Sequence, residues 1–72
     1  MCGIIGIASR ENVSSNILNA LKKLEYRGYD SAGIAINTAK KINQKKAKGK
    51  LDNLIYALQE DQFDGNTGIG HT

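Results

Sequence analysis

Apolar runs and polar segments follow one another along this chain, and each apolar run has the period of a strand or a helix. Residues 2–8 form a short apolar run that ends in polar residues, which predicts a buried strand. Apolar residues then recur at the spacing of one helix face, at Val13, Ile17, Leu21 and Leu24. This spacing predicts a helix over 13–26, with Asn12 or Ser14 as its amino-terminal cap and Gly28 just past its end.

The second half of the chain repeats this pattern. Residues 32–36 are apolar and predict a second strand, and the lysine-rich stretch after them predicts a hairpin with a polar edge strand around 42–49. A second short helix is predicted by apolar residues at helical spacing, Leu51, Leu54, Ile55 and Leu58. Residues 61–66 are typical of a loop, and 67–72 begin another buried strand.

The predicted order of elements is therefore β-α-β-β-α-β, a mixed α/β (α+β) fold. A chain of 72 residues forms at most one small domain. The strands at 2–8, 32–36 and 67–72 are apolar enough to be central strands covered on both faces. Two short helices cover only one face, and the last strand has no element after it. We therefore expect a piece of a larger domain that aggregates or melts without cooperativity on its own.

The charge is mild but unevenly distributed. The formal net charge is +3, and six lysines lie between Lys40 and Lys50. Lysine on an edge strand blocks further pairing, whereas a basic cluster is also able to contact the phosphates of a nucleic acid. The cluster contains no aromatic residue for base stacking, so we predict a solvated hairpin and no nucleic-acid partner. A small basic nucleic-acid-binding module is the alternative.

Cysteine and histidine counts limit the chemistry further. One cysteine and one histidine cannot supply the usual four ligands of a zinc site, so no metal and no cofactor are predicted. A single cysteine fits a reducing compartment. The opening apolar run is too short to span a membrane, and no basic residues precede it as in a signal peptide. These features predict a cytoplasmic protein with no membrane partner.

The single cysteine stands directly after the initiator methionine. Met1 is commonly removed before a small residue, and removal would leave the thiol of Cys2 and a free α-amino group on one carbon. An unperturbed α-amino group has a pKa of about 7.7–8.0, so at neutral pH it is partly free to take the proton of the thiol. Cys2 is then a candidate nucleophile, and the alternative is a small buried hydrophobic residue.

The glycines do not indicate phosphate binding. The spacing of Gly3 and Gly6 is not that of a dinucleotide fingerprint, and no helix begins directly after them. The pair Gly68 and Gly70 is an equally weak signal. Glycine inside a strand more often marks a close approach of another backbone or a bulge.

Three segments together carry a family resemblance: Met1-Cys2-Gly3-Ile4-Ile5-Gly6, Leu24-Glu25-Tyr26-Arg27-Gly28-Tyr29-Asp30-Ser31-Ala32-Gly33 and Thr67-Gly68-Ile69-Gly70-His71-Thr72. The chain resembles the class II glutamine amidotransferases, which have an N-terminal nucleophile. The full middle segment, and Gly49-Lys50-Leu51 after it, are similar to the branch of that family that aminates fructose 6-phosphate. Another class II amidotransferase is the alternative. The resemblance covers essentially all 72 residues.

The resemblance implies an activity and a set of roles. Cys2 would attack the side-chain amide of L-glutamine with its own α-amino group as base, and Arg27 and Gly28 would orient Cys2. The ammonia would reach fructose 6-phosphate in a separate carboxy-terminal domain of a homo-oligomeric enzyme. Arg27 is otherwise a structural ion-pair partner of Asp30. His71 is expected to be structural, because the family uses the amine as its base.

The resemblance also implies an architecture. Residues 1–72 would be the amino-terminal part of a type-2 glutamine amidotransferase domain. The parent fold would be a four-layer α/β/β/α sandwich, with Cys2 at the start of a central strand. In the family, the groups that bind glutamine and stabilise the oxyanion follow the segment that matches His71-Thr72. We therefore expect these residues alone to be inactive.

Overall fold

The computed structural model describes residues 3–25, 31–60 and 63–72 of the chain. These residues form strands and helices in the predicted order β-α-β-β-α-β. The elements are β1 (Ile4–Ala8), α1 (Ser14–Leu24), β2 (Ser31–Thr38), β3 (Lys41–Lys48), α2 (Leu51–Glu60) and β4 (Thr67–His71). The prediction of a mixed α/β fold is confirmed.

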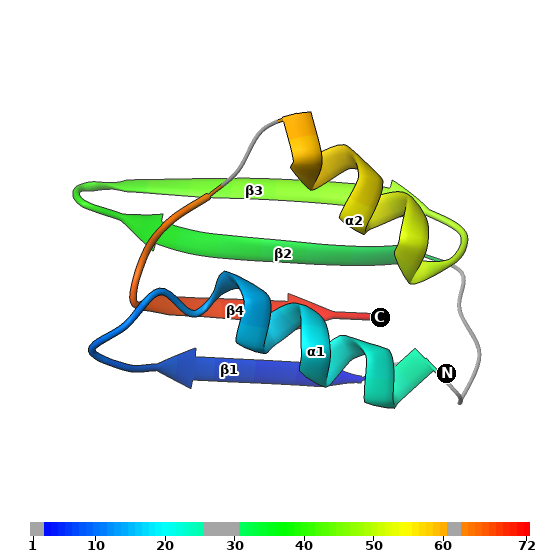
Figure 1. Ribbon diagram of the computed structural model, residues 1–72, viewed down its shortest axis with the longest axis horizontal. Helices are drawn as coiled ribbons and strands as arrows, with labels where there is room; N and C mark the ends of the chain where they lie inside the picture. The colour runs from blue at the N-terminus through cyan, green and yellow to red at the C-terminus, as the bar shows by residue number, and fades with distance from the viewer. Residues whose placement is uncertain (1–2, 26–30, 61–62) are drawn as a thin grey trace.

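The four strands form one antiparallel sheet in the order β1-β4-β2-β3. Strand β4, the last in the chain, pairs with β1 on one side and β2 on the other, and β3 follows beyond β2 (Figure 1). Both helices lie on the same face of this sheet, with α1 over β1 and β4 and α2 over β2 and β3. The described residues therefore make two layers, one of helices and one of sheet.

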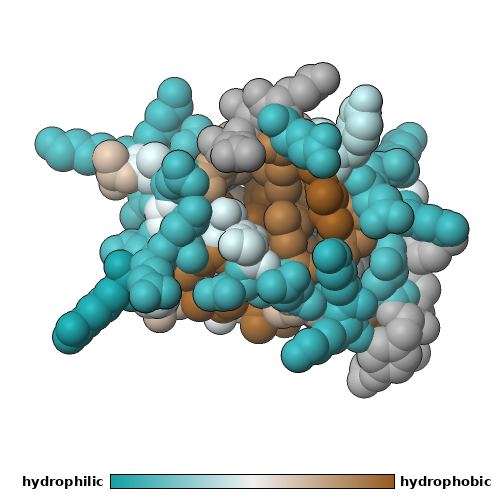
Figure 2. All heavy atoms as spheres, viewed as in Figure 1, coloured by the Kyte–Doolittle hydropathy of each residue, from teal (hydrophilic) through white to brown (hydrophobic). Residues whose placement is uncertain are grey.

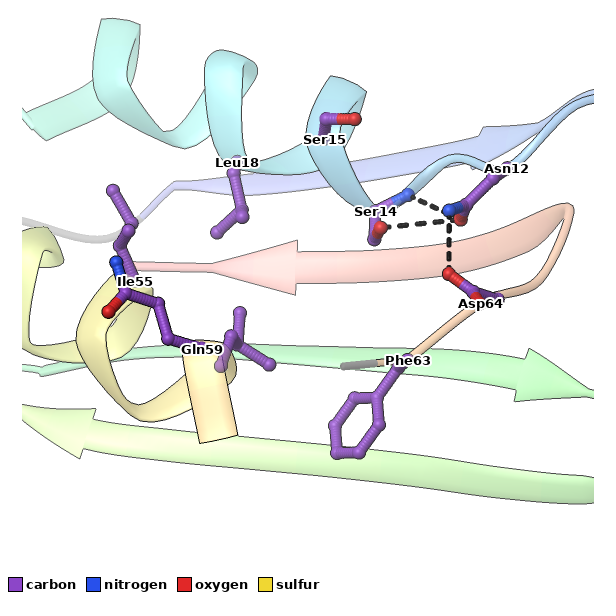
Figure 3. Close-up of a pocket in the computed structure, with 9 residues that line it drawn as sticks. Asn12, Ser14, Ser15, Leu18, Ile55, Gln59, Phe63 and Asp64 are labelled. Atoms are coloured by element: carbon purple, nitrogen blue, oxygen red, sulfur yellow. Dashed lines mark hydrogen bonds between the residues drawn. The ribbon is translucent and has the colours of Figure 1, made fainter. Parts of the chain in front are cut away.

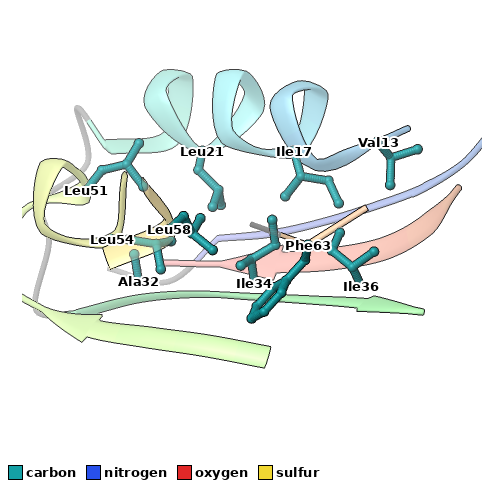
Figure 4. Close-up of a cluster of buried hydrophobic side chains, with 10 residues drawn as sticks. All are labelled: Val13, Ile17, Leu21, Ala32, Ile34, Ile36, Leu51, Leu54, Leu58 and Phe63. Atoms are coloured by element: carbon teal, nitrogen blue, oxygen red, sulfur yellow. The ribbon is translucent and has the colours of Figure 1, made fainter. Parts of the chain in front are cut away.

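The hydrophobic core lies between these two layers (Figure 4). Its buried residues are Val13, Ile17, Leu21, Ala32, Ile34, Ile36, Leu51, Leu54, Leu58 and Phe63. Glycine allows α1 to pack closely onto β4: a Cβ on Gly70 would lie 2.6 Å from Cγ2 of Ile17 and 3.1 Å from Cδ1 of Leu21. The absence of a side chain at Gly70 thus leaves room for two side chains of the helix above it.

The opposite face of the sheet is open. Ile4, Ile42 and Ile69 are 80%, 71% and 57% exposed, and the alternation of side chains along the strands places all three on this face. The two helices thus cover only one face of the sheet, as predicted, and the coverage of residues 2–8 on both faces within a larger domain stays a prediction. Strand β1 lies at an edge of the described sheet. The expected place of Cys2, at the start of a central strand of the parent fold, lies outside the described residues and stays a prediction. An apolar run indicates that a strand tends to be buried. It does not indicate which other elements are present to bury it.

The element ends differ slightly from the predicted ones. Helix α1 has Val13 at its N-cap position, while the predicted cap Asn12 accepts a hydrogen bond from the N–H of Ser14 at 3.2 Å. Strand β2 is longer than predicted because it forms a complete hairpin with β3, with Ala39 at a φ of 56° in the turn. Gly28, the predicted helix stop, lies outside the described residues. Within the described chain, neither helix is long and apolar enough to cross a membrane.

Candidate functional site

The predicted site residues Cys2, Arg27 and Gly28 lie outside the described residues. The structure does describe the residues next to them in the chain. Gly3 follows Cys2, and Glu25 ends the described segment that leads toward Arg27. These residues and Thr72 lie at one end of the sheet, which we call the motif end because all three motif segments reach it (Figure 1).

The first and last motif segments meet through paired hydrogen bonds. The N–H of Gly3 donates to Oγ1 of Thr72 at 3.1 Å, and the N–H of Thr72 donates to the carbonyl oxygen of Gly3 at 3.0 Å. These bonds continue the β1–β4 ladder one pair beyond Ile4 and His71. The residue that follows the candidate nucleophile is thus attached to a residue 69 positions away in the sequence.

The first and middle motif segments meet through a close packing contact. A Cβ on Gly3 would lie only 2.8 Å from Cδ1 of Leu24, at the carboxy-terminal end of α1. Only glycine fits under this leucine without a shift of the side chain. The close approach at Gly3 is made by a side chain and not by the backbone expected for a strand glycine, whereas Gly6 faces the open side and a Cβ there would make ordinary contacts, the nearest at 3.8 Å.

The middle and last motif segments meet on the open face. Gly33 and His71 are paired residues of β2 and β4, and a Cβ on Gly33 would overlap the imidazole of His71. The imidazole therefore lies across Gly33, which is buried beneath it although it belongs to the open face. This packing explains the glycine and agrees with the structural role expected for His71. A hollow of about 240 Å³ on the open face is lined by His71, Lys46 and Ile69 among other residues.

Glu25 is a motif residue to which the sequence alone assigned no role. Its Oε2 accepts a hydrogen bond of 2.6 Å from the N–H of Leu51, the first residue of α2. The first N–H groups of a helix have no partner within the helix, and a carboxylate there also interacts favourably with the helix dipole. Lys50, immediately before α2, is a poor cap, and that is the one sequence signal that an acceptor comes from elsewhere.

The lysine cluster follows the polar edge of the sheet, as predicted. Among the described strands, β3 pairs only with β2, and its residues alternate between the two faces. Lys46 and Lys48 project on the open face, whereas Lys41 and Lys45 project on the other. The cluster is divided between two faces of an edge strand, a disposition that favours the solvated hairpin over a single basic surface.

A separate pocket lies away from the motif end. It is a hollow of about 320 Å³ between the helices, lined in part by Leu18, Ile55, Leu58 and Phe63. Figure 2 shows hydrophobic side chains near the middle of this face, surrounded by hydrophilic ones. At its rim, the side chain of Asn12 accepts from the N–H of Ser14 and donates from Nδ2 to Oδ1 of Asp64 at 2.9 Å (Figure 3).

Comparison with known proteins gives a consistent result. The chain is 50% identical over 72 residues to the glutamine–fructose-6-phosphate aminotransferase (isomerizing) of Bradyrhizobium diazoefficiens. It is 54% identical over 72 residues to the enzyme of that name from Clostridium acetobutylicum, and 55% identical over 73 residues to that from Gluconobacter oxydans. In each case all of this chain is covered, and it spans 12% of the length of the relative.

These similarities confirm the resemblance that the motif segments indicate. They extend along the whole chain, including the lysine-rich hairpin and α2, and all three relatives carry the name of one enzyme that pairs glutamine with fructose 6-phosphate. No protein-family model matches the chain.

Proposed function

We propose that this chain is the amino-terminal part of a glutamine–fructose-6-phosphate aminotransferase and carries the nucleophile of its glutamine-hydrolysing half. Similarity over all 72 residues to enzymes of that name supports the proposal. The other class II amidotransferases are less favoured, because the relatives share this one name.

Cys2 performs the chemistry in this proposal. After removal of Met1, the thiol transfers its proton to its own α-amino group, and the thiolate attacks the side-chain amide carbon of glutamine. The tetrahedral intermediate collapses to a γ-glutamyl thioester as the amine returns the proton to the departing ammonia. Water then cleaves the thioester, which releases glutamate and restores the thiol. Arg27 and Gly28 orient Cys2 during these steps.

The observation that carries the proposal is the meeting of the three motif segments. Gly3 contacts both Thr72 and Leu24, and Gly33 lies beneath His71. A Cβ at either glycine would collide with a residue of another motif segment. A nucleophile must be held in one orientation to react efficiently, and orientation accounts for about 7–11 kcal/mol of the barrier in favourable cases. Mutual contacts among the segments that flank Cys2 and Arg27 supply such a frame.

The rest of the activity is assigned to sequence beyond these residues. The ammonia passes to a separate domain that isomerises and aminates fructose 6-phosphate, in a cytoplasmic enzyme. The chain spans 12% of the relatives' length, and the exposed isoleucines Ile4, Ile42 and Ile69 leave an apolar sheet face that further sequence of the same domain would cover.

The test uses the complete polypeptide with Cys2→Ala and Cys2→Ser variants. Both replacements keep a small second residue, so removal of Met1 is checked by intact mass and is expected in all three proteins. Glutamate production from glutamine should fall by about 10⁴-fold or more in Cys2→Ala, as when other nucleophiles are removed. Isomerisation of the sugar phosphate should persist. Glutaminase activity that survives Cys2→Ala, or Met1 retained on active enzyme, would refute the assignment.

The chain of 72 residues is expected to release no ammonia from glutamine when it is expressed alone. Its open sheet face leaves large isoleucines in water, so sedimentation should show aggregation and the thermal transition should be broad. A monomer with a sharp two-state transition would contradict the proposal that this chain is part of a larger domain.

A further inference from the structure

The pair of hydrogen bonds between Gly3 and Thr72 is unusual for a β-ladder. In an antiparallel sheet, a hydrogen-bonded pair of residues exchanges two bonds between backbone groups. The N–H of Thr72 makes one such bond to the Gly3 carbonyl, at 3.0 Å. The N–H of Gly3 instead donates to the side-chain hydroxyl of Thr72, at 3.1 Å. One of the two hydrogen bonds between these residues therefore depends on the type of side chain that residue 72 carries.

Gly3 is restrained on another side as well. Its Cα lies so close to Leu24 that an added Cβ would stand 2.8 Å from Cδ1 of that residue. With its carbonyl and N–H both bonded to Thr72, Gly3 has little freedom to rotate. These contacts involve half-buried residues, where a backbone N–H that loses its acceptor is not fully compensated by water.

The covalent chain carries this restraint to the nucleophile. The Gly3 nitrogen is two bonds from the Cα of residue 2, and the peptide group between them is planar. An acceptor on the Gly3 N–H therefore restrains the plane that contains the Cα to which the thiol and the α-amino group of Cys2 are attached. We propose that Thr72 is a positioning residue for Cys2, whose hydroxyl orients the Cys2–Gly3 peptide. This inference rests on the proposed function.

Threonine suits this role better than its closest analogues. Its β-branched side chain is stiff at χ1, so the hydroxyl is held in one direction from the strand. Valine has nearly the same shape but no acceptor, and it would leave the Gly3 N–H without its partner. Serine keeps the acceptor with more rotational freedom. A positional error of about 1 Å costs on the order of 10²-fold in rate.

The experiment compares Thr72→Val, Thr72→Ala and Thr72→Ser in the complete polypeptide. The Thr67→Val variant is a matched control, because Thr67 lies at the opposite end of β4 and its hydroxyl is bonded only to the neighbouring Asn66 among the described contacts. The measurements are kcat and KM for glutamine hydrolysis, the pH dependence of Cys2 alkylation by iodoacetamide, the thermal midpoint and the intact mass.

Thr72→Val and Thr72→Ala should lower kcat by about 10²-fold with KM changed less than about threefold. They should also change the pH profile of Cys2 alkylation, while Thr72→Ser should recover most of kcat and Thr67→Val should match the parent. If Thr72→Val keeps the kcat of the parent, or if Thr72→Val and Thr72→Ser lose the same amount of kcat, the positioning role of Thr72 is overturned while the proposed function stands. Loss of folding in both hydroxyl-free variants would also overturn that role, because Thr72 would then be a stability residue. Absence of Cys2-dependent hydrolysis in the parent would overturn the proposed function, and this inference with it.

Discussion

The two faces of the sheet come from the same strands but are completed in different ways. On the helix side, Gly68 and Gly70 of β4 allow α1 to approach, and the space between the layers is filled by the buried core. On the open side, Ile69 of the same strand is 57% exposed, and His71 covers Gly33 without any second layer above it. The helix face is therefore complete within these residues, whereas the open face is apolar without a partner.

The two faces therefore explain different residues of the motif segments: contacts within this chain explain those on the helix face, but not those on the open face. Glycines on the helix face are required by the packing of this chain with itself. The isoleucines on the open face have no such explanation within the described residues, so they favour a partner layer from further sequence. Gly33 and His71 belong to both groups: they contact each other within this chain, and they lie on the open face that further sequence would cover.

The sharpest test of the comparison places the same substitution on each face. Gly70→Ala should destabilise the complete polypeptide by about 3 kcal/mol, because the new Cβ would stand 2.6 Å from a buried methyl of Ile17. Gly6→Ala on the neighbouring strand of the same polypeptide should cost clearly less, because its Cβ would meet only ordinary contacts among the described residues. Urea denaturation measures both. Equal effects would mean that the two faces do not differ in packing.

A second test asks whether the open face is covered in the complete protein. Ile69→Thr keeps the branch at Cβ but replaces the ethyl group by a hydroxyl, so it is nearly neutral on an exposed face. If further sequence covers Ile69, the same change should cost about 2 kcal/mol in the complete polypeptide. Denaturation midpoints of the complete polypeptide and of the variant measure this. A neutral result there would contradict the proposed second layer.

The contact of Gly33 with His71 gives a smaller effect that a double-mutant cycle isolates. Gly33→Ala should cost about 1–2 kcal/mol, because the imidazole must move away from the new Cβ and lose its place on the strand. In a His71→Ala background the added methyl should cost less, with a coupling energy of about 1 kcal/mol. Strictly additive effects, measured by urea denaturation, would show that His71 does not rest on Gly33.

The smallest expected effect concerns the bond that joins the two helices of the covered face. Glu25→Ala removes the acceptor for the N–H of Leu51 and should cost about 1 kcal/mol. Glu25→Gln keeps an acceptor oxygen without the charge and should cost about half as much. Thermal unfolding at matched ionic strength is the measurement. If Gln and Ala gave the same loss, the effect would not come from capping α2.

Local patterns were sufficient for the elements and their order. The spacing of Val13, Ile17 and Leu21 corresponds to one helix face, and all three are fully buried, Val13 at the N-cap position and the other two within α1. The lysines of β3 correctly indicated a polar edge strand. These features depend on residues within one or two turns of each other, so the sequence alone determines them. The motif segments likewise identified the relatives, because identity along the chain needs no structure.

The tertiary structure alone decided which distant residues meet. Gly3 pairs with Thr72 across 69 positions, and Glu25 caps a helix that begins 26 residues later. No local pattern encodes such a pairing, because it depends on strand register and on which layers are present. The same limit applies at β1: its apolar residues show a strong tendency to be buried, but within the described sheet the strand lies at an edge with Ile4 80% exposed. Whether a strand is buried depends on the layers that pack against it, and the sequence of one strand does not specify those neighbours.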